Sequence, residues 1–297
     1  MNRRAFALSA VATLSGVVTL AVTRAHAQDS APGAPRTYRY ARTPGAAPDL
    51  QSLDLYAASG QIRPLVVFIH GGGWRIGDKT TATAGREKAA FFNARGLAYA
   101  SLNYRLSPGV THPAHVEDVA AALAWLADHA ADHGLDPHRI YLMGHSAGAH
   151  LAALVATDAR RLSHYGRTPA MLRGVIVLDG AGYDVTEQAP ATMQRGGLLG
   201  EMYQAAFGDD PAGWADASPV NFVARGHVTA PFLIVHTDRP DSVRQSTLLA
   251  DKLRDAGVEA RLFRAAGYTH ADVNRRIGQP GEPVTGAIIE ALHRWGV

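Results

Sequence analysis

The sequence predicts an α/β fold with a mostly parallel central sheet and helices on both faces. Three observations support this fold class. The chain has 297 residues, which is enough to bury one large core. Short apolar runs alternate along it with amphipathic, helix-like segments. The runs are apolar almost throughout, as expected for parallel strands covered on both sides. We therefore expect a single α/β domain over residues 49–297.

The expected elements alternate regularly in chain order. An early strand is expected within 50–58, and the later strands at 64–70, 97–104, 139–144, 174–180, 231–237 and 259–266. Helices are expected at 86–96, 115–134, 148–162, 242–257 and 282–297. Residues 183–229 show no clear strand. They predict either a small lid over the carboxyl edge of the sheet or an irregular helical connection.

The N-terminal segment has the features of an export signal. Arg3 and Arg4 precede an apolar stretch that ends in the A-x-A sequence of residues 25–27, which predicts cleavage after Ala27. The two arginines also resemble a twin-arginine signal. An uncleaved membrane anchor is the alternative, but the stretch is only weakly hydrophobic. We expect a periplasmic or secreted protein without stable membrane association, and a flexible lead-in over residues 28–48.

Charge and cysteine content exclude several function classes. Residues 1–27 hold three of the 29 basic side chains and no acidic one, so their removal leaves basic and acidic residues in equal number. The remaining chain gives no argument for a nucleic-acid partner. The absence of cysteine excludes disulfides, thiol catalysis and cysteine-based zinc sites.

Ser146 is the strongest candidate nucleophile. It lies in the G-x-S-x-G sequence of residues 144–148, between an expected strand and an expected helix. A sharp strand-to-helix turn needs small neighbours, and it lifts the serine hydroxyl above the carboxyl edge of the sheet, where α/β proteins bind ligands.

A glycine-rich sequence after the strand at 64–70 predicts an oxyanion site. His70 is followed by three consecutive glycines, whose backbone can turn N–H groups toward a ligand. Acyl transfer needs such donors where the carbonyl oxygen becomes an anion. We expect the N–H groups of Gly72, Gly73 and Ala147 to supply them.

A serine hydroxyl needs a base to take its proton and an acid to orient that base. His270, after the last expected strand, is the candidate base. Two aspartates after the strand at 231–237 qualify as the acid. We favour Asp241, although it could instead cap the following helix, and keep Asp238 as the alternative.

Other histidines invite a metal interpretation. His129 and His133 stand four residues apart on one expected helix, but no convincing third ligand accompanies them. His112 and His115 flank a proline in a loop. We expect no metal and no cofactor. Trp74 is expected to pack in the core or to line a substrate pocket.

Several sequences occur together in the order found in a known superfamily. HGGGWRIGDK, LNYRLSP, GHSAGAH, RPDSVRQS and GYTH resemble the serine α/β-hydrolase superfamily, in particular its carboxylesterase branch near the hormone-sensitive-lipase-like and arylformamidase-like enzymes. The resemblance implies an α/β-hydrolase fold, a triad of Ser146, Asp241 and His270, and oxyanion donors at Gly72, Gly73 and Ala147. The usual H-G-x-x-D sequence around the acid is altered here.

The expected function is hydrolysis of small carboxylic esters through an acyl-enzyme on Ser146, with a small-molecule ester as the partner. An arylformamidase-like amidohydrolase with the same triad is the first alternative. A small-molecule binding protein that has lost catalysis on the same fold is the second.

Overall fold

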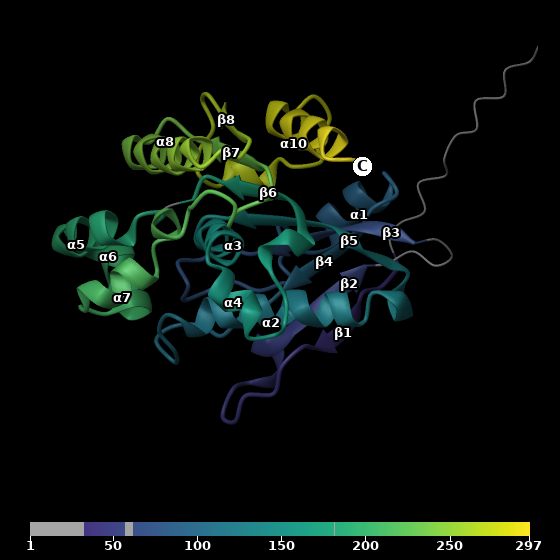
Figure 1. Cartoon of the computed structure of the whole chain (residues 1–297), viewed down its shortest axis with the longest axis horizontal. Helices are drawn as coiled ribbons and strands as arrows, with labels where there is room; N and C mark the ends of the chain where they lie inside the picture. The colour runs from purple at the N-terminus through teal and green to yellow at the C-terminus, as the bar shows by residue number, and fades with distance from the viewer. Residues whose placement is uncertain (1–32, 57–61, 181) are drawn as a thin grey trace, which may run out of the picture. The chain divides into compact units, whose positions relative to one another are not determined.

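A sheet with the strand order β1-β2-β4-β3-β5-β6-β7-β8 organises the computed structural model, which describes residues 33–56, 62–180 and 182–297 (Figure 1). Its strands are β1 Arg36–Arg39, β2 Ser52–Tyr56, β3 Arg63–Ile69, β4 Ala98–Leu102, β5 Leu135–His145, β6 Leu172–Leu178, β7 Phe232–His236 and β8 Ala260–Arg264. β2 pairs antiparallel with β1 and β4, and every pair from β4 to β8 is parallel. The mostly parallel sheet predicted from the sequence is confirmed. The expected signal, residues 1–27, lies outside the described residues.

Strand β1 differs from the expectation for the lead-in. Residues 28–48 were expected to be flexible, yet Arg36–Arg39 pairs with β2, with Tyr38 opposite Leu53. The next residue, Tyr40, is buried and donates its hydroxyl to the carbonyl of Asn103 at 2.7 Å. The strand forms because β2 offers it a free edge, which the composition of the lead-in does not reveal.

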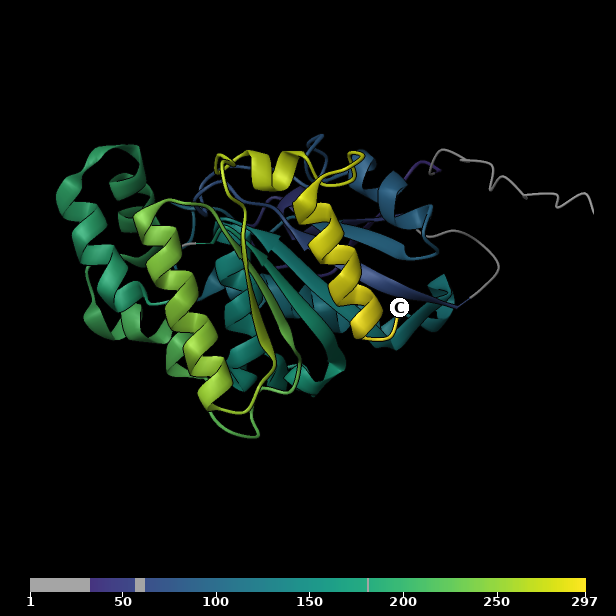
Figure 2. The same cartoon turned by 90° about the horizontal axis from the view of Figure 1, so that it is seen from above.

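Helices cover both faces of the sheet (Figure 2). The α-helices are α1 Arg86–Asn93, α2 Ala114–Asp128, α3 Ala147–Thr157, α4 Ala159–Ser163, α5 Val185–Arg195, α6 Gly197–Phe207, α7 Pro211–Asp216, α8 Pro240–Asp255, α9 Asp272–Arg275 and α10 Pro283–Arg294. Short 3-10 helices occur at Pro48–Gln51 (η1), Ala131–His133 (η2), Pro169–Met171 (η3) and Pro219–Asn221 (η4).

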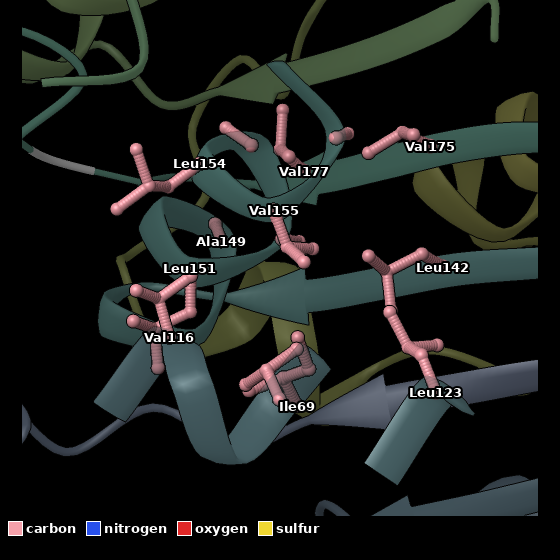
Figure 3. Packing of buried hydrophobic residues seen from close by; sticks show 14 of the residues in the cluster. Ile69, Val116, Leu123, Leu142, Ala149, Leu151, Leu154, Val155, Val175 and Val177 are labelled. Carbon is pink, nitrogen blue, oxygen red and sulfur yellow. The ribbon is translucent and has the colours of Figure 1, made fainter. Parts of the chain in front are cut away.

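Two apolar layers hold the sheet between these helices. On β3, Val66 and Phe68 face the layer that contains α1 and α10, whereas Val67 and Ile69 face the layer that contains α2, α3 and α8. This alternation explains why the strands are apolar throughout. Figure 3 shows part of the second layer, with Val155 of α3 near the side chains of the sheet.

Residues 183–229 form a helical insertion between β6 and β7, built from α5, α6, α7 and η4. It gathers beside α8 (Figure 1), where the backbone N–H of Asp184 donates to Gln245 at 2.8 Å. The absence of a strand in this segment agrees with the sequence prediction. Within the described part of the chain, no helix has the length and apolar character needed to cross a membrane.

Candidate active site

Ser146 occupies a strained turn between β5 and α3. Its backbone has φ of 56° and ψ of −120°, a conformation that side-chain-bearing residues rarely adopt. The flanking glycines have no room for a side chain. A Cβ at Gly144 would lie 2.2 Å from the carbonyl oxygen of Gly148, and a Cβ at Gly148 would lie 2.2 Å from that of Ile69. The turn therefore requires glycine at both positions, and it raises the serine at the carboxyl edge of the sheet.

His270 reaches this serine from the loop after β8, as expected from the sequence. Its Nε2 lies 3.0 Å from Ser146 Oγ, within hydrogen-bond distance. Its Nδ1 lies 2.6 Å from a carboxylate oxygen of Asp179. A histidine that donates from Nδ1 to a carboxylate presents an unprotonated Nε2 to the hydroxyl, which is the state a general base needs.

The prediction that Asp241, or alternatively Asp238, contacts His270 is wrong. Asp241 lies in the first turn of α8, and its carboxylate contacts the Arg239 side chain at 3.4 Å. Asp238 is exposed and pairs with Arg264 at 2.6 Å. Both side chains are held by neighbouring arginines, whereas Asp179 occupies the position beside the imidazole.

Asp179 directly follows the last residue of β6 and is completely buried. Burial alone would raise its pKa. Hydrogen bonds from His270 and Ser242 and the nearby charge of Arg239 outweigh that effect, and they hold the pKa of the Asp179 carboxyl well below its usual range. The side chain is therefore ionised at neutral pH and can stabilise a positive charge on the imidazole.

His145 packs against His270 and binds its backbone. Its Nε2 donates to the backbone carbonyl of His270 at 2.9 Å, and the two ring centroids are 4.6 Å apart. Burial, together with the nearby His270 ring, lowers the pKa of His145 to about 3. The ring is thus neutral at physiological pH, and it fixes the loop that carries His270.

The glycine loop after β3 lies against the same serine. A Cβ added at Gly71 would lie 3.0 Å from Ser146 Cβ. Gly72 has φ of 116°, which only glycine adopts readily. No backbone carbonyl in the described chain accepts the N–H of Gly72, Gly73 or Ala147. These three groups, predicted as oxyanion donors, are therefore free to bind an anion at the start of α3.

A cavity of about 420 Å³ opens above Ser146. Its lining includes the polar residues Thr81, Thr83 and Asn274, and α6 of the insertion contributes the apolar side chains of Leu199 and Met202. Its volume is that of a small-molecule site.

Trp74 packs in the core next to the cavity. Its indole is buried, and it meets the rings of His150, Tyr203 and Phe207 edge-on. Of the two roles expected for Trp74, the structure supports core packing.

The histidines considered as metal ligands have other partners. His129 pairs through Nδ1 with the carbonyl of Trp125 at 2.8 Å, and His112 contacts Asp216 at 2.9 Å. In the portion of the chain described here, no group of three or more His, Cys, Asp or Glu side chains could hold a metal ion.

Asp179 is the site residue that sequence reasoning missed. It falls within the run of residues 174–180, which predicts a strand. The available signal was an aspartate at the carboxyl end of a buried strand, at the edge where ligands bind.

Comparison with known proteins shows that the chain is similar to esterases. The family model BD-FAE matches residues 53–253. Esterase LipQ of Mycobacterium tuberculosis is 34% identical over 217 residues, which cover 67% of this chain and 48% of LipQ. Isoprenylcysteine alpha-carbonyl methylesterase ICME of Arabidopsis thaliana is 28% identical over 239 residues, which cover 74% of this chain and 54% of ICME. The chain thus spans about half the length of these relatives.

A solved structure shares most of the fold. The hyperthermophilic esterase of Pyrobaculum calidifontis superimposes with a TM-score of 0.69 at 25% identity, covering 82% of this chain and 81% of that chain. The fold is therefore the α/β-hydrolase fold, and the resemblance to carboxylesterases of that superfamily is confirmed.

Proposed function

Because the chain belongs to the BD-FAE family, we propose that it is a serine carboxylesterase that hydrolyses small carboxylic esters through an acyl-enzyme on Ser146. One observation carries the proposal: Asp179, His270 and Ser146 form a continuous line of contacts of 2.6 and 3.0 Å beside unpaired backbone N–H groups. The esterase names of the relatives support the same class of reaction.

The first half-reaction forms the acyl-enzyme. His270 Nε2 takes the hydroxyl proton as Ser146 Oγ attacks the ester carbonyl carbon. The carbonyl oxygen becomes an anion, which the N–H groups of Gly72, Gly73 and Ala147 bind. Asp179 stabilises the imidazolium through Nδ1. When the tetrahedral intermediate collapses, the C–O bond to the alcohol breaks, and the alcohol leaves with the proton from Nε2.

The second half-reaction releases the acid. A water molecule attacks the acyl carbon while His270 Nε2 takes one of its protons. The second tetrahedral intermediate then collapses, and Ser146 Oγ leaves with that proton. The products are one alcohol and one carboxylic acid, and the enzyme returns to its starting state.

The test of this mechanism uses Ser146→Ala together with a fluorophosphonate probe that labels activated serines. Wild-type protein should form an adduct on Ser146, and Ser146→Ala should form none and lose turnover by a factor of about 10³ or more, because the nucleophile is gone. Ser163→Ala is the matched control, since this exposed serine of α4 contacts the carbonyl of Arg160. It should retain full activity.

Two results would contradict the proposal. Retained turnover in Ser146→Ala would exclude the acyl-enzyme on this serine. Folded wild-type protein with neither adduct nor turnover would favour the alternative of a binding protein on this fold.

Substrate size is the finer part of the proposal. A cavity of about 420 Å³ has room for a short acyl chain with a compact alcohol, and this size favours short esters as substrates. A panel of p-nitrophenyl esters from acetate to palmitate should therefore show the highest kcat/KM at short chain length. Including one formyl anilide distinguishes the arylformamidase-like alternative, which would turn over the anilide fastest.

The location of the enzyme is proposed from its N-terminal sequence alone. We propose that residues 1–27 direct export and are removed. The mass of the protein isolated from its native host should then correspond to residues 28–297, and a mass that retains residues 1–27 would contradict cleavage.

A further inference from the structure

The Asp179 carboxylate accepts hydrogen bonds from several groups in addition to His270. Oδ1 accepts from the backbone N–H of Thr237 at 2.9 Å, from its hydroxyl at 3.0 Å and from Ser242 Oγ. Oδ2 accepts from His270 and, at 3.1 Å, from Nη2 of Arg239. These contacts use about all the acceptor positions of a carboxylate. Every donor except His270 comes from the segment 237–242, which follows β7.

Arg239 differs from the other donors because it carries a charge. Its Nη2 lies 3.5 Å from His270 Nδ1, so the guanidinium approaches the base as well as the acid. Its Nη1 contacts Asp241 at 3.4 Å, and Nε contacts the Thr237 hydroxyl at 3.4 Å. These contacts hold the Arg239 side chain in place, although it is 36% exposed to solvent.

We propose that Arg239 is a positioning residue of the esterase reaction, which fixes the Asp179 carboxylate against His270 and sets the pH range in which His270 acts as a base. The inference rests on the proposed function. Asp241, which the sequence suggested as the acid, acts here as the carboxylate that holds Arg239 in place.

Two separable effects follow from this geometry. A planar guanidinium donates in a fixed direction, so it restricts rotation of the carboxylate and keeps Oδ2 on Nδ1. Its positive charge also opposes a second positive charge on the adjacent imidazole. Loss of the first effect lowers kcat. Loss of the second moves the acid limb of the pH profile to higher pH.

The other groups near His270 must be considered in reading such a profile. The charged or titratable groups in contact with it or on the surrounding elements include Asp179 after β6, Arg239 and Asp241 around the start of α8, His145 at the end of β5 and Lys88 of α1 near His145. Asp78, His70 and Arg275 line the same cavity, and Asp272 lies two residues along the chain from His270. His145 stays neutral above pH 4, since burial lowers its pKa to about 3. His145 therefore adds no titration between pH 5 and 9. Lys88 does titrate in this range, because burial lowers its pKa to about 7, but it does so in the wild type and in every variant. The comparison therefore uses the shift of the midpoint between variants.

The experiment compares Arg239→Gln, Arg239→Lys and a matched control, Arg264→Gln. Arg264 lies outside the cavity lining in an exposed pair with Asp238. For each variant, kcat and KM for p-nitrophenyl acetate are measured from pH 5 to 9, and Tm is measured to confirm folding. Spontaneous hydrolysis is subtracted at each pH.

Arg239→Gln should lower kcat about 5- to 30-fold with little change in KM, and should move the midpoint of the acid limb of kcat/KM upward by about 0.5–1 pH unit. Arg239→Lys keeps the charge but not the planar fork, so it should retain the wild-type midpoint and recover only part of kcat. Arg264→Gln should match the wild type in both.

A wild-type kcat and midpoint in Arg239→Gln would overturn the proposal. A fall in kcat with an unmoved midpoint would also overturn it, because a purely structural contact gives that result. A profile of Arg239→Lys that follows Arg239→Gln would show that charge is not the operative property. Ser146→Ala distinguishes a failure of the proposed esterase function from a failure of the proposed role of Arg239. If Ser146→Ala is inactive while Arg239→Gln behaves as wild type, the role of Arg239 is wrong and the esterase assignment stands.

Discussion

The segments after β6 and β7 both carry aspartates at the carboxyl edge of the sheet, but these aspartates contact different side chains. The first places Asp179 against His270, whereas the second places Asp238 and Asp241 against arginines. The second loop nevertheless supplies Thr237 and other donors that hold Asp179. Burial and the position of a strand in the sheet, rather than the presence of an aspartate after a given strand, therefore decide which carboxylate contacts the base.

Strand order explains why Asp179, and not Asp238 or Asp241, contacts His270. β6 lies beside β5, and the backbone N–H of Ser146 donates to the carbonyl of Leu178 at 3.0 Å. The residue after Leu178 is therefore next to the nucleophile turn. Asp179 is held from the other side by its N–H, which donates to Val235 of β7 at 2.7 Å. Asp241 lies in the first turn of α8 instead, and its carboxylate contacts Arg239 rather than the imidazole.

Asp179→Asn should give the largest change in activity among the aspartate substitutions. Asparagine keeps the shape but loses the charge that stabilises the imidazolium, and it no longer enforces the Nδ1–H tautomer. We expect kcat to fall by about 10³- to 10⁴-fold at pH 7.5, with Tm as the check on folding. A loss smaller than 10-fold in folded protein would show that the β6 aspartate is not the acid.

The same comparison shows what the sequence can predict. Ser146, His270 and the glycine loop were found because each stands in a local pattern next to an expected strand. Asp179 was missed because its role depends on which strands are neighbours and on donors 58 or more positions away along the chain. Strand β1 was missed for a similar reason, since Arg36–Arg39 becomes a strand only by pairing with β2.

Lys88 is a second buried ionisable group near the site. Asp179 is surrounded by donors, whereas Lys88 of α1, with 2% exposure, makes one hydrogen bond, from Nζ to the carbonyl of Asn274 at 2.8 Å. Its Nζ also lies 5.2 Å from the centre of the Phe68 ring. Burial lowers the pKa of Lys88 from 10.5 to about 7. The buried carboxylate of Asp179 is thus surrounded by donors, whereas the buried ammonium group of Lys88 has one acceptor.

Lys88→Met should remove a pH dependence of stability. Between about pH 7 and 10.5 the unfolded chain binds a proton at Lys88 that the folded chain does not. The free energy of unfolding should therefore rise with pH by about 1.4 kcal/mol per unit from this residue. Urea unfolding at pH 7.5, 8.5 and 9.5 should show wild type gaining stability relative to Lys88→Met.

The control for this measurement is Lys252→Met, in which an exposed lysine of α8 is replaced. The free energy of unfolding of Lys252→Met should change with pH in the same way as that of the wild type. If the free energy of unfolding of Lys88→Met also changes with pH as in the wild type, Lys88 does not titrate in this range in the folded protein.

Asp241→Asn and Asp238→Asn should give the smallest effects on kcat, because neither carboxylate contacts His270. Asp241 holds Arg239 at 3.4 Å, so its loss loosens the guanidinium and should lower kcat about 2- to 3-fold. Asp238 pairs with Arg264 in the solvent, and its loss should leave kcat within about 1.5-fold of the wild type. Both variants are assayed beside Asp179→Asn with the same ester at saturating concentration. A loss in either that approaches the loss in Asp179→Asn would return the acid to the loop after β7, and would mean that this loop rearranges when substrate binds.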